Sequence, residues 1–193
     1  MKECKTLSVE EMKFIGDSFK KMFPNREDFT VLHEIESKYV HSDIGILSGE
    51  SCNTILFTMG MSCTIMDGGK QCEVFVELPK EAFYQNPTEQ VLANGAKLND
   101  IINPEYSFII RDLIDISKMP AQDHEIYKDL DTLSINTRIY GLRKIFSMDN
   151  IDAFYIVQLS IHDLAKLNKI KRSDKEKYFS DRVKPISYNF WEN

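Results

Sequence analysis

The hydrophobic pattern of the chain changes period several times, and each change predicts a different element. Apolar residues recur at helical spacing over 9–22, behind a capping box made by Ser8 and Glu11 and ahead of Pro24. From 29 to 47 the residues become β-branched and aromatic, with a strand-like alternation of faces. The pattern therefore predicts one amphipathic helix followed by a pair of strands.

The remaining elements follow from the same periodicities and from turn residues. In chain order they are strands at 54–59 and 72–78, a helix at 88–98 capped by Thr88, a helix between Asn103 and Met119, strands at 132–135, 138–146 and 153–159, and a closing helix capped by Ser160. The second of these helices is predicted to turn four residues inward, namely Phe108, Ile109, Leu113 and Ile116. Strands in runs, with helices before, between and after them, indicate an α+β fold: one domain with a mixed, mainly antiparallel sheet covered by helices.

Length and composition bound the organisation of the chain. Its 193 residues, 42% of them hydrophobic, suffice for one core of ordinary size but not for two large domains. No repeat, low-complexity tract or linker marks a boundary. We therefore expect a helix within 1–27 packed on a main unit at 28–170, with 171–193 as a charged extension of the same compact unit.

The charge balance narrows the choice of partner. With 24 Lys plus Arg against 30 Asp plus Glu, the net charge of -6 argues against nucleic-acid binding, which needs a dominant positive surface. A charged partner is therefore expected to be basic. The segment 166–184 is locally basic; we interpret it as a solvated helix face, with an RNA-binding tail as the alternative.

The start of the chain contains no apolar run of signal-peptide length, and no later segment approaches the roughly 18 apolar residues of a membrane span. The four cysteines form no CxxC pair and are interpreted as free thiols. Nucleotide-binding, zinc-protease and hydrolase signatures are absent. We therefore expect a cytoplasmic protein that carries no cofactor and does not bind membranes.

One cluster of polar residues has the composition of a chemical site. It comprises His33, Glu34, Glu36, His41 and Asp43. Strand geometry requires only His41 and Asp43 to share a face, and the sequence does not fix the register that would bring in a second histidine. One interpretation is a metal-dependent or acid/base enzyme that uses His33, His41 and Asp43. The favoured interpretation is that His33, Glu34 and Asp43 satisfy buried backbone groups and hold the strand pair in register.

The segment around Gly60 also has two interpretations. Cys63, beside Ser62, has the chemistry of a nucleophile, but a core or turn thiol is favoured because no positioned base is evident. Met59 and Met61 suit either an adaptable binding surface or irregular gaps in the core, and the core is the commoner use. Gly60 is predicted to mark a bulge or bend.

Several motifs in sequence resemble the suppressor of fused family. They are HEIESKYVHSDI at 33–44, FTMGMS at 57–62, EVFVELP at 73–79, FIIRDLIDISKMPAQDHEIYKDLDTLSI at 108–135 and FYIVQLSIHDLAKLNK at 154–169. Their order and spacing are similar to the family's over about 28–170. The resemblance implies a structural motif made of His33, Glu34, His41, Asp43, Met59, Gly60, Met61, Ser62, Glu77 and Pro79.

The resemblance implies a function as well as a fold. It implies a module with no known catalytic activity that acts by binding another protein, and no metal ligands are assigned from the resemblance. Animal members carry a second domain and sequester a zinc-finger transcription factor by gripping an extended peptide, whereas short bacterial members look like immunity proteins of polymorphic toxin systems. A basic toxin domain is therefore the expected partner of this monomer or weak dimer, and a regulator that sequesters a transcription factor is the alternative.

The resemblance also implies a binding surface. Asp131 matches an aspartate that the family carries just before a strand, whereas Met119 stands where peptide-binding members have an aromatic residue. The expected partner-binding residues are Asp131, Tyr127, Met119, Asp123, Glu125 and Asp129. The acidic members of this loop suit a basic partner, and an adjoining strand edge would supply main-chain hydrogen bonds.

Overall fold

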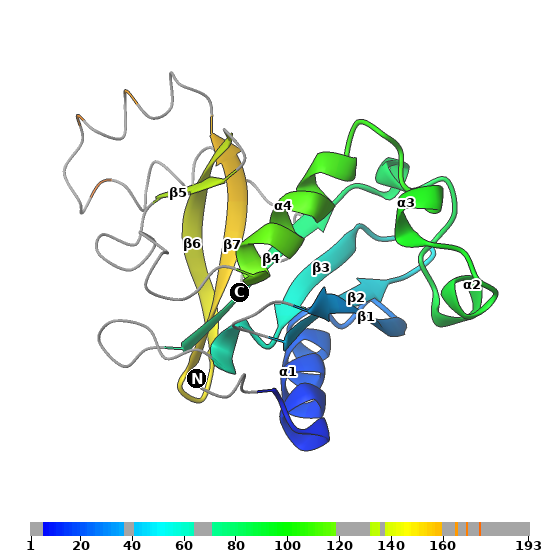
Figure 1. Ribbon diagram of the computed structural model, residues 1–193, viewed down its shortest axis with the longest axis horizontal. Coiled ribbons are helices and arrows are strands. Elements are labelled where there is room, and N and C mark those ends of the chain that lie inside the picture. Colours follow the sequence, from blue (N-terminus) through cyan, green and yellow to red (C-terminus); the bar gives the residue numbers. More distant parts are fainter. Residues whose placement is uncertain are drawn as a thin grey trace.

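The computed structural model describes residues 6–36, 41–63, 71–118, 132–135 and 138–159, together with the single residues 165, 169 and 174. Within this part of the chain, seven strands form one sheet in the order β1-β2-β3-β4-β7-β6-β5 (Figure 1). All neighbouring strands are antiparallel except β4 and β7, which run parallel. The predicted α+β class with a mixed, mainly antiparallel sheet is confirmed.

The first half of the fold is a helix followed by a four-stranded meander. Its elements are α1 (Val9–Met22), β1 (Asp28–Glu36), β2 (His41–Ser48), β3 (Thr54–Met59) and β4 (Gln71–Leu78). The predicted capping box begins α1: the Ser8 amide donates to Glu11 Oε2 at 2.7 Å, and the Glu11 amide donates to Ser8 Oγ at 3.2 Å. The helix and the strands of this half lie where the periodicities predicted them.

The middle of the chain departs from its prediction at one point. The helices are α2 (Glu89–Ala93), α3 (Leu98–Ile101) and α4 (Ser107–Lys118). Thr88 caps α2 as predicted, but the expected single helix over 88–98 is wrong, because the chain leaves the helix at Gly95, which has φ +91°. Glycine adopts this left-handed conformation without steric cost, so the helix ends there and α3 begins as a separate turn.

The second half adds three strands and closes the sheet. They are β5 (Thr132–Ile135), β6 (Arg138–Met148) and β7 (Ile151–Leu159), and β6 and β7 are joined by a tight turn in which Asp149 has φ 53°. β7 then pairs with β4, with Gln71 opposite Ile151 and Phe75 opposite Tyr155. The predicted strands are confirmed, whereas the helix predicted after Ser160 and the basic segment 166–184 lie outside the described residues apart from single positions.

The sheet buries side chains on both faces, and α1 and α4 lie on opposite sides of it (Figure 1). On the α1 side the rings of Phe19 and Phe57 stack with centroids 4.0 Å apart, and Phe75 meets Phe19 edge-on. On the α4 side, Leu113 and Ile116 are fully buried as predicted. Two short 3₁₀ turns, η1 (Met61–Cys63) and η2 (Lys80–Ala82), follow β3 and β4.

The inward face of α4 differs in detail from the prediction. Phe108 and Ile109 are half-buried, and Ile110 is buried in their place. No helix in the described part of the chain is long and apolar enough to cross a membrane.

Candidate functional site

The predicted polar cluster lies at an irregularity between β1 and β2. Leu32 pairs with Ile44, and the next pair is Ile35 with Ser42. Two residues of β1, His33 and Glu34, therefore stand against one residue of β2, Asp43, which is the geometry of a β-bulge. The register thus places the backbone of a histidine and of a glutamate against that of Asp43.

Past the bulge the pairing resumes, with Glu36 opposite His41. Asp43 is only 3% exposed and its Cα is paired with that of Met59 in β3. The Asp43 side chain is therefore almost completely removed from solvent, and its predicted structural role stays a prediction. Among the described residues, no group of three or more His, Cys, Asp or Glu side chains is placed to hold a metal ion.

A second polar centre, built on Glu73 of β4, was not predicted as a site. Its fully buried carboxylate accepts four hydrogen bonds from the end of β3 and from η1. Oε1 accepts from the Gly60 amide at 3.0 Å, the Ser62 amide at 3.0 Å and the Ser62 hydroxyl at 2.6 Å. Oε2 accepts from the Thr58 hydroxyl at 2.5 Å. Glu73 therefore fixes the turn that carries the TMGMS motif.

The electrostatics of Glu73 reflect two opposing effects. Burial raises the pKa of this carboxyl above its usual range, and the hydrogen bonds from Ser62, Thr58 and Gly60 act against that rise. The only sequence signal for this role was a glutamate among apolar residues in QCEVFVEL. A charged residue in an otherwise apolar, central strand is a signal for a buried acceptor.

The neighbouring residues of the turn are part of the core. Met59 and Met61 are each 2% exposed, so the prediction that they fill the core is confirmed. Gly60 has φ +131° at the end of β3, which confirms the predicted bend. Cys63 is buried in η1, as a core or turn thiol would be.

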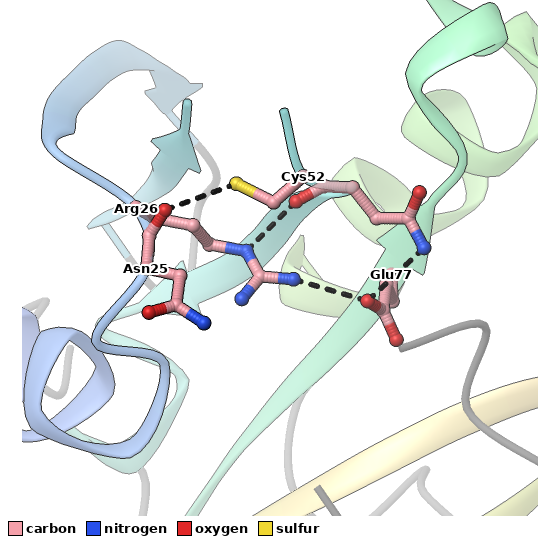
Figure 2. A network of polar contacts seen from close by, with 5 residues as sticks. Asn25, Arg26, Cys52 and Glu77 are labelled. Atoms are coloured by element: carbon pink, nitrogen blue, oxygen red, sulfur yellow. Dashed lines mark hydrogen bonds and ion pairs between the residues drawn. The ribbon is translucent and has the colours of Figure 1, made fainter. Parts of the chain in front are cut away.

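A third polar centre joins the loop between α1 and β1 to the loop before β3 and to β4 (Figure 2). The buried guanidinium of Arg26 donates to the Asn53 carbonyl at 2.7 Å and to Glu77 Oε1 at 3.0 Å, and it lies over the ring of Phe23. Burial lowers the pKa of Arg26, and the charge of Glu77 opposes that decrease. Beside it the Cys52 thiol donates to the Asn25 carbonyl. Glu77, expected as a structural residue, therefore holds the loop between α1 and β1 against β4, and Pro79 directly follows β4.

The expected partner-binding residues precede β5 in the sequence. Asp131, Tyr127, Met119, Asp123, Glu125 and Asp129 are all outside the described residues. The strand that directly follows Asp131 is β5, which has a neighbour on one side only within the described part of the chain. The acidic segment therefore leads into an outer strand.

Comparisons of this chain with protein-family models, with curated proteins and with solved structures found no match.

Proposed function

We propose that this chain is a non-enzymatic protein-binding module, and that it acts as a cytoplasmic immunity protein that neutralises a basic toxin by direct binding. The observation that carries the proposal is the position of β5, which is an outer strand among the described residues and directly follows the acidic segment 123–131 in the sequence. An extended segment of a partner can add to such an edge through main-chain hydrogen bonds, while nearby side chains select its sequence.

The two outer strands of the sheet differ in a way that favours β5. Proteins protect exposed edges with bulges and charged residues, because an open edge otherwise pairs with other chains. β1 has both features, a bulge at 33–34 and the acidic residues Asp28, Glu34 and Glu36. β5 reads TLSI, without a charge, and its four residues pair regularly with β6. The β5 edge is the better template for a partner strand.

Charge supports the choice of a basic partner. Four acidic residues stand against one lysine over 123–131, and the whole chain has a net charge of -6. Opposite charges on two proteins raise their association rate by steering encounter, and an immunity protein must capture its toxin quickly. The same net charge disfavours nucleic acid as the partner.

Proline substitutions in β5 test the edge directly. In an antiparallel edge strand, neighbouring residues direct their N–H groups alternately toward the sheet and away from it. Of Leu133→Pro and Ser134→Pro, we expect one variant to lose stability and the other to keep its fold but lose binding of the toxin encoded beside this gene. Retained binding by the variant that keeps its fold would exclude the β5 edge.

A charge reversal tests the acidic segment. Asp131→Lys is expected to weaken toxin binding by about 1–3 kcal/mol with little change in melting temperature. Asp17→Lys at an exposed position of α1, on the opposite side of the sheet from α4, makes the same change of charge; it is the matched control and should weaken affinity much less. Growth rescue of cells that make the toxin is the functional assay, and it should fail in the variant that does not bind.

Other results would point to the alternative functions. Stoichiometric zinc in the purified protein, lost on His41→Ala, or turnover of a small compound would contradict the proposal and favour the enzyme built on His33, His41 and Asp43. A gene without a toxin gene beside it, and co-purification with a transcription factor, would favour the regulator.

A further inference from the structure

A cavity of about 260 Å³ lies between α3, α4 and the β1–β2 pair. Five of its lining residues are apolar: Leu32, Ile44, Leu98, Ile110 and Ile114. Leu32 and Ile44 stand opposite each other in the strand register, so together they form the wall on the sheet side. The remaining lining residues are Lys97 and Asn99, both exposed to solvent. The cavity thus has an aliphatic interior and a polar mouth.

The end of α2 before Gly95 determines which residues line the mouth of the cavity. Because the chain leaves the helix there and begins α3 only at Leu98, the Leu98 side chain is buried at 5% exposure while its two neighbours stay in solvent. The end of this segment is held by the isolated bridge between Phe83 and Ile102. The backbone segment that borders the cavity is therefore attached to the rest of the fold at Ile102.

One charged residue, Lys97, lines the mouth of the cavity, and an acidic residue lies beside it. The carboxylate of Asp100 accepts from the Lys97 backbone amide at 3.2 Å. Within the described part of the chain, the Lys97 ammonium has no ion-pair partner, and it is the only charged group that lines the cavity. The amide of Asn99 offers a further hydrogen-bond donor. An anionic group is the complement of this mouth.

We propose that the cavity binds a small amphiphilic carboxylate, with its apolar body between α4 and the β1–β2 pair and its carboxylate at Lys97 and Asn99. An apolar cavity of about 150 Å³ takes one benzene ring, so a body of about six to ten carbon atoms fits this volume. Pockets with apolar walls and a few converging polar groups are the usual form of small-molecule sites. The proposal is independent of partner binding at β5.

Octanoate and its neutral counterpart 1-octanol are the probes. Titration of the full chain with octanoate, followed by ¹H–¹³C NMR of Leu and Ile methyl groups, should give saturable shifts with a dissociation constant below about 1 mM. Ile114→Trp fills the cavity from a half-buried position and should abolish these shifts. Lys97→Gln, at an exposed position, should weaken octanoate about two- to fivefold and leave 1-octanol unchanged.

Lys20→Gln on α1 removes the same charge on the other side of the sheet and is the matched control, expected to bind octanoate like the unmodified chain. Absence of saturable shifts would overturn the proposal, as would unaltered octanoate binding by folded Ile114→Trp protein. Equal weakening of both probes by Lys97→Gln, or of octanoate by Lys20→Gln, would overturn the assignment of the carboxylate to Lys97. If neither probe binds and Ile114→Trp instead abolishes toxin binding, the cavity receives a side chain of the partner and the proposal is wrong.

Discussion

The buried carboxylate of Glu73 allows the role of a hydrogen-bond acceptor to be separated from the role of a charge. Glu73→Met keeps a side chain of similar length but removes both oxygens, whereas Glu73→Gln keeps one oxygen. In the Met variant the amides of Gly60 and Ser62 lose their acceptor at 3.0 Å. An unsatisfied buried donor costs about 1–3 kcal/mol, so the two amides together predict a loss of about 2–6 kcal/mol.

The Gln variant is expected to behave differently. Its carbonyl oxygen can take the place of Oε1 and accept all three hydrogen bonds from Gly60 and Ser62, while its NH₂ group faces Thr58. The substitution also removes the cost of burying a charge, which is the cause of the raised pKa of Glu73. We therefore expect Glu73→Gln to be at least as stable as the unmodified chain at pH 7.

Urea denaturation and thermal melting at pH 7, both monitored by circular dichroism, measure the stability of the two variants. For a chain of this size, 1 kcal/mol corresponds to about 2–4 °C in melting temperature, so Glu73→Met should melt at least about 4 °C lower. Amide hydrogen exchange should accelerate at Gly60 and Ser62 in the Met variant alone. Equal destabilisation by Met and Gln would refute the reasoning, because it would show that the charge carries the stabilisation.

Three further predictions concern the same core. Because folding raises the pKa of Glu73 from 4.5, the native state holds this proton more tightly than the unfolded state does. The free energy of unfolding, relative to that of Glu73→Gln, should therefore fall as pH rises above about 4.5. Urea titrations of the two proteins at a series of pH values test this, and an increase in the relative free energy of unfolding would contradict it. Arg26→Met should cost about 3–5 kcal/mol by leaving Glu77 buried without its cation, and pairing it with Glu77→Leu should restore much of the loss in a double-mutant cycle. Asp43→Ala should lower the free energy of unfolding by about 1–3 kcal/mol, which an unchanged melting temperature would disprove.

Elements whose signal is local could be predicted from the sequence. α1 was predictable because its cap, its apolar spacing and the following proline agree. The strands were predictable for the same reason, since each combines β-branched or aromatic residues with a bounding turn. Gly95 was misjudged because a glycine within a helical pattern is often tolerated, and only its φ of +91° shows that the helix ends there.

The arrangement of the polar residues could not be predicted, because it depends on contacts between strands. The sequence places His33, Glu34 and Asp43 close together, but only the shift in register shows that the first two stand against the third. Likewise, nothing local connects Glu73 to Ser62 or Arg26 to Glu77, since each bond joins elements that are distant along the chain. The cavity is the same kind of feature, formed where four separate elements meet.

The parallel pair at the centre of the sheet has a consequence for how this chain folds. β1 to β4 form by successive hairpins, and so do β6 and β7, which are fast local steps. The contact between β4 and β7 spans a much longer loop and is therefore the slow step. During translation, the second edge of β4 waits unpaired until residues 151–155 have left the ribosome. The central strand of the finished sheet is thus open to pairing with another chain until β7 arrives.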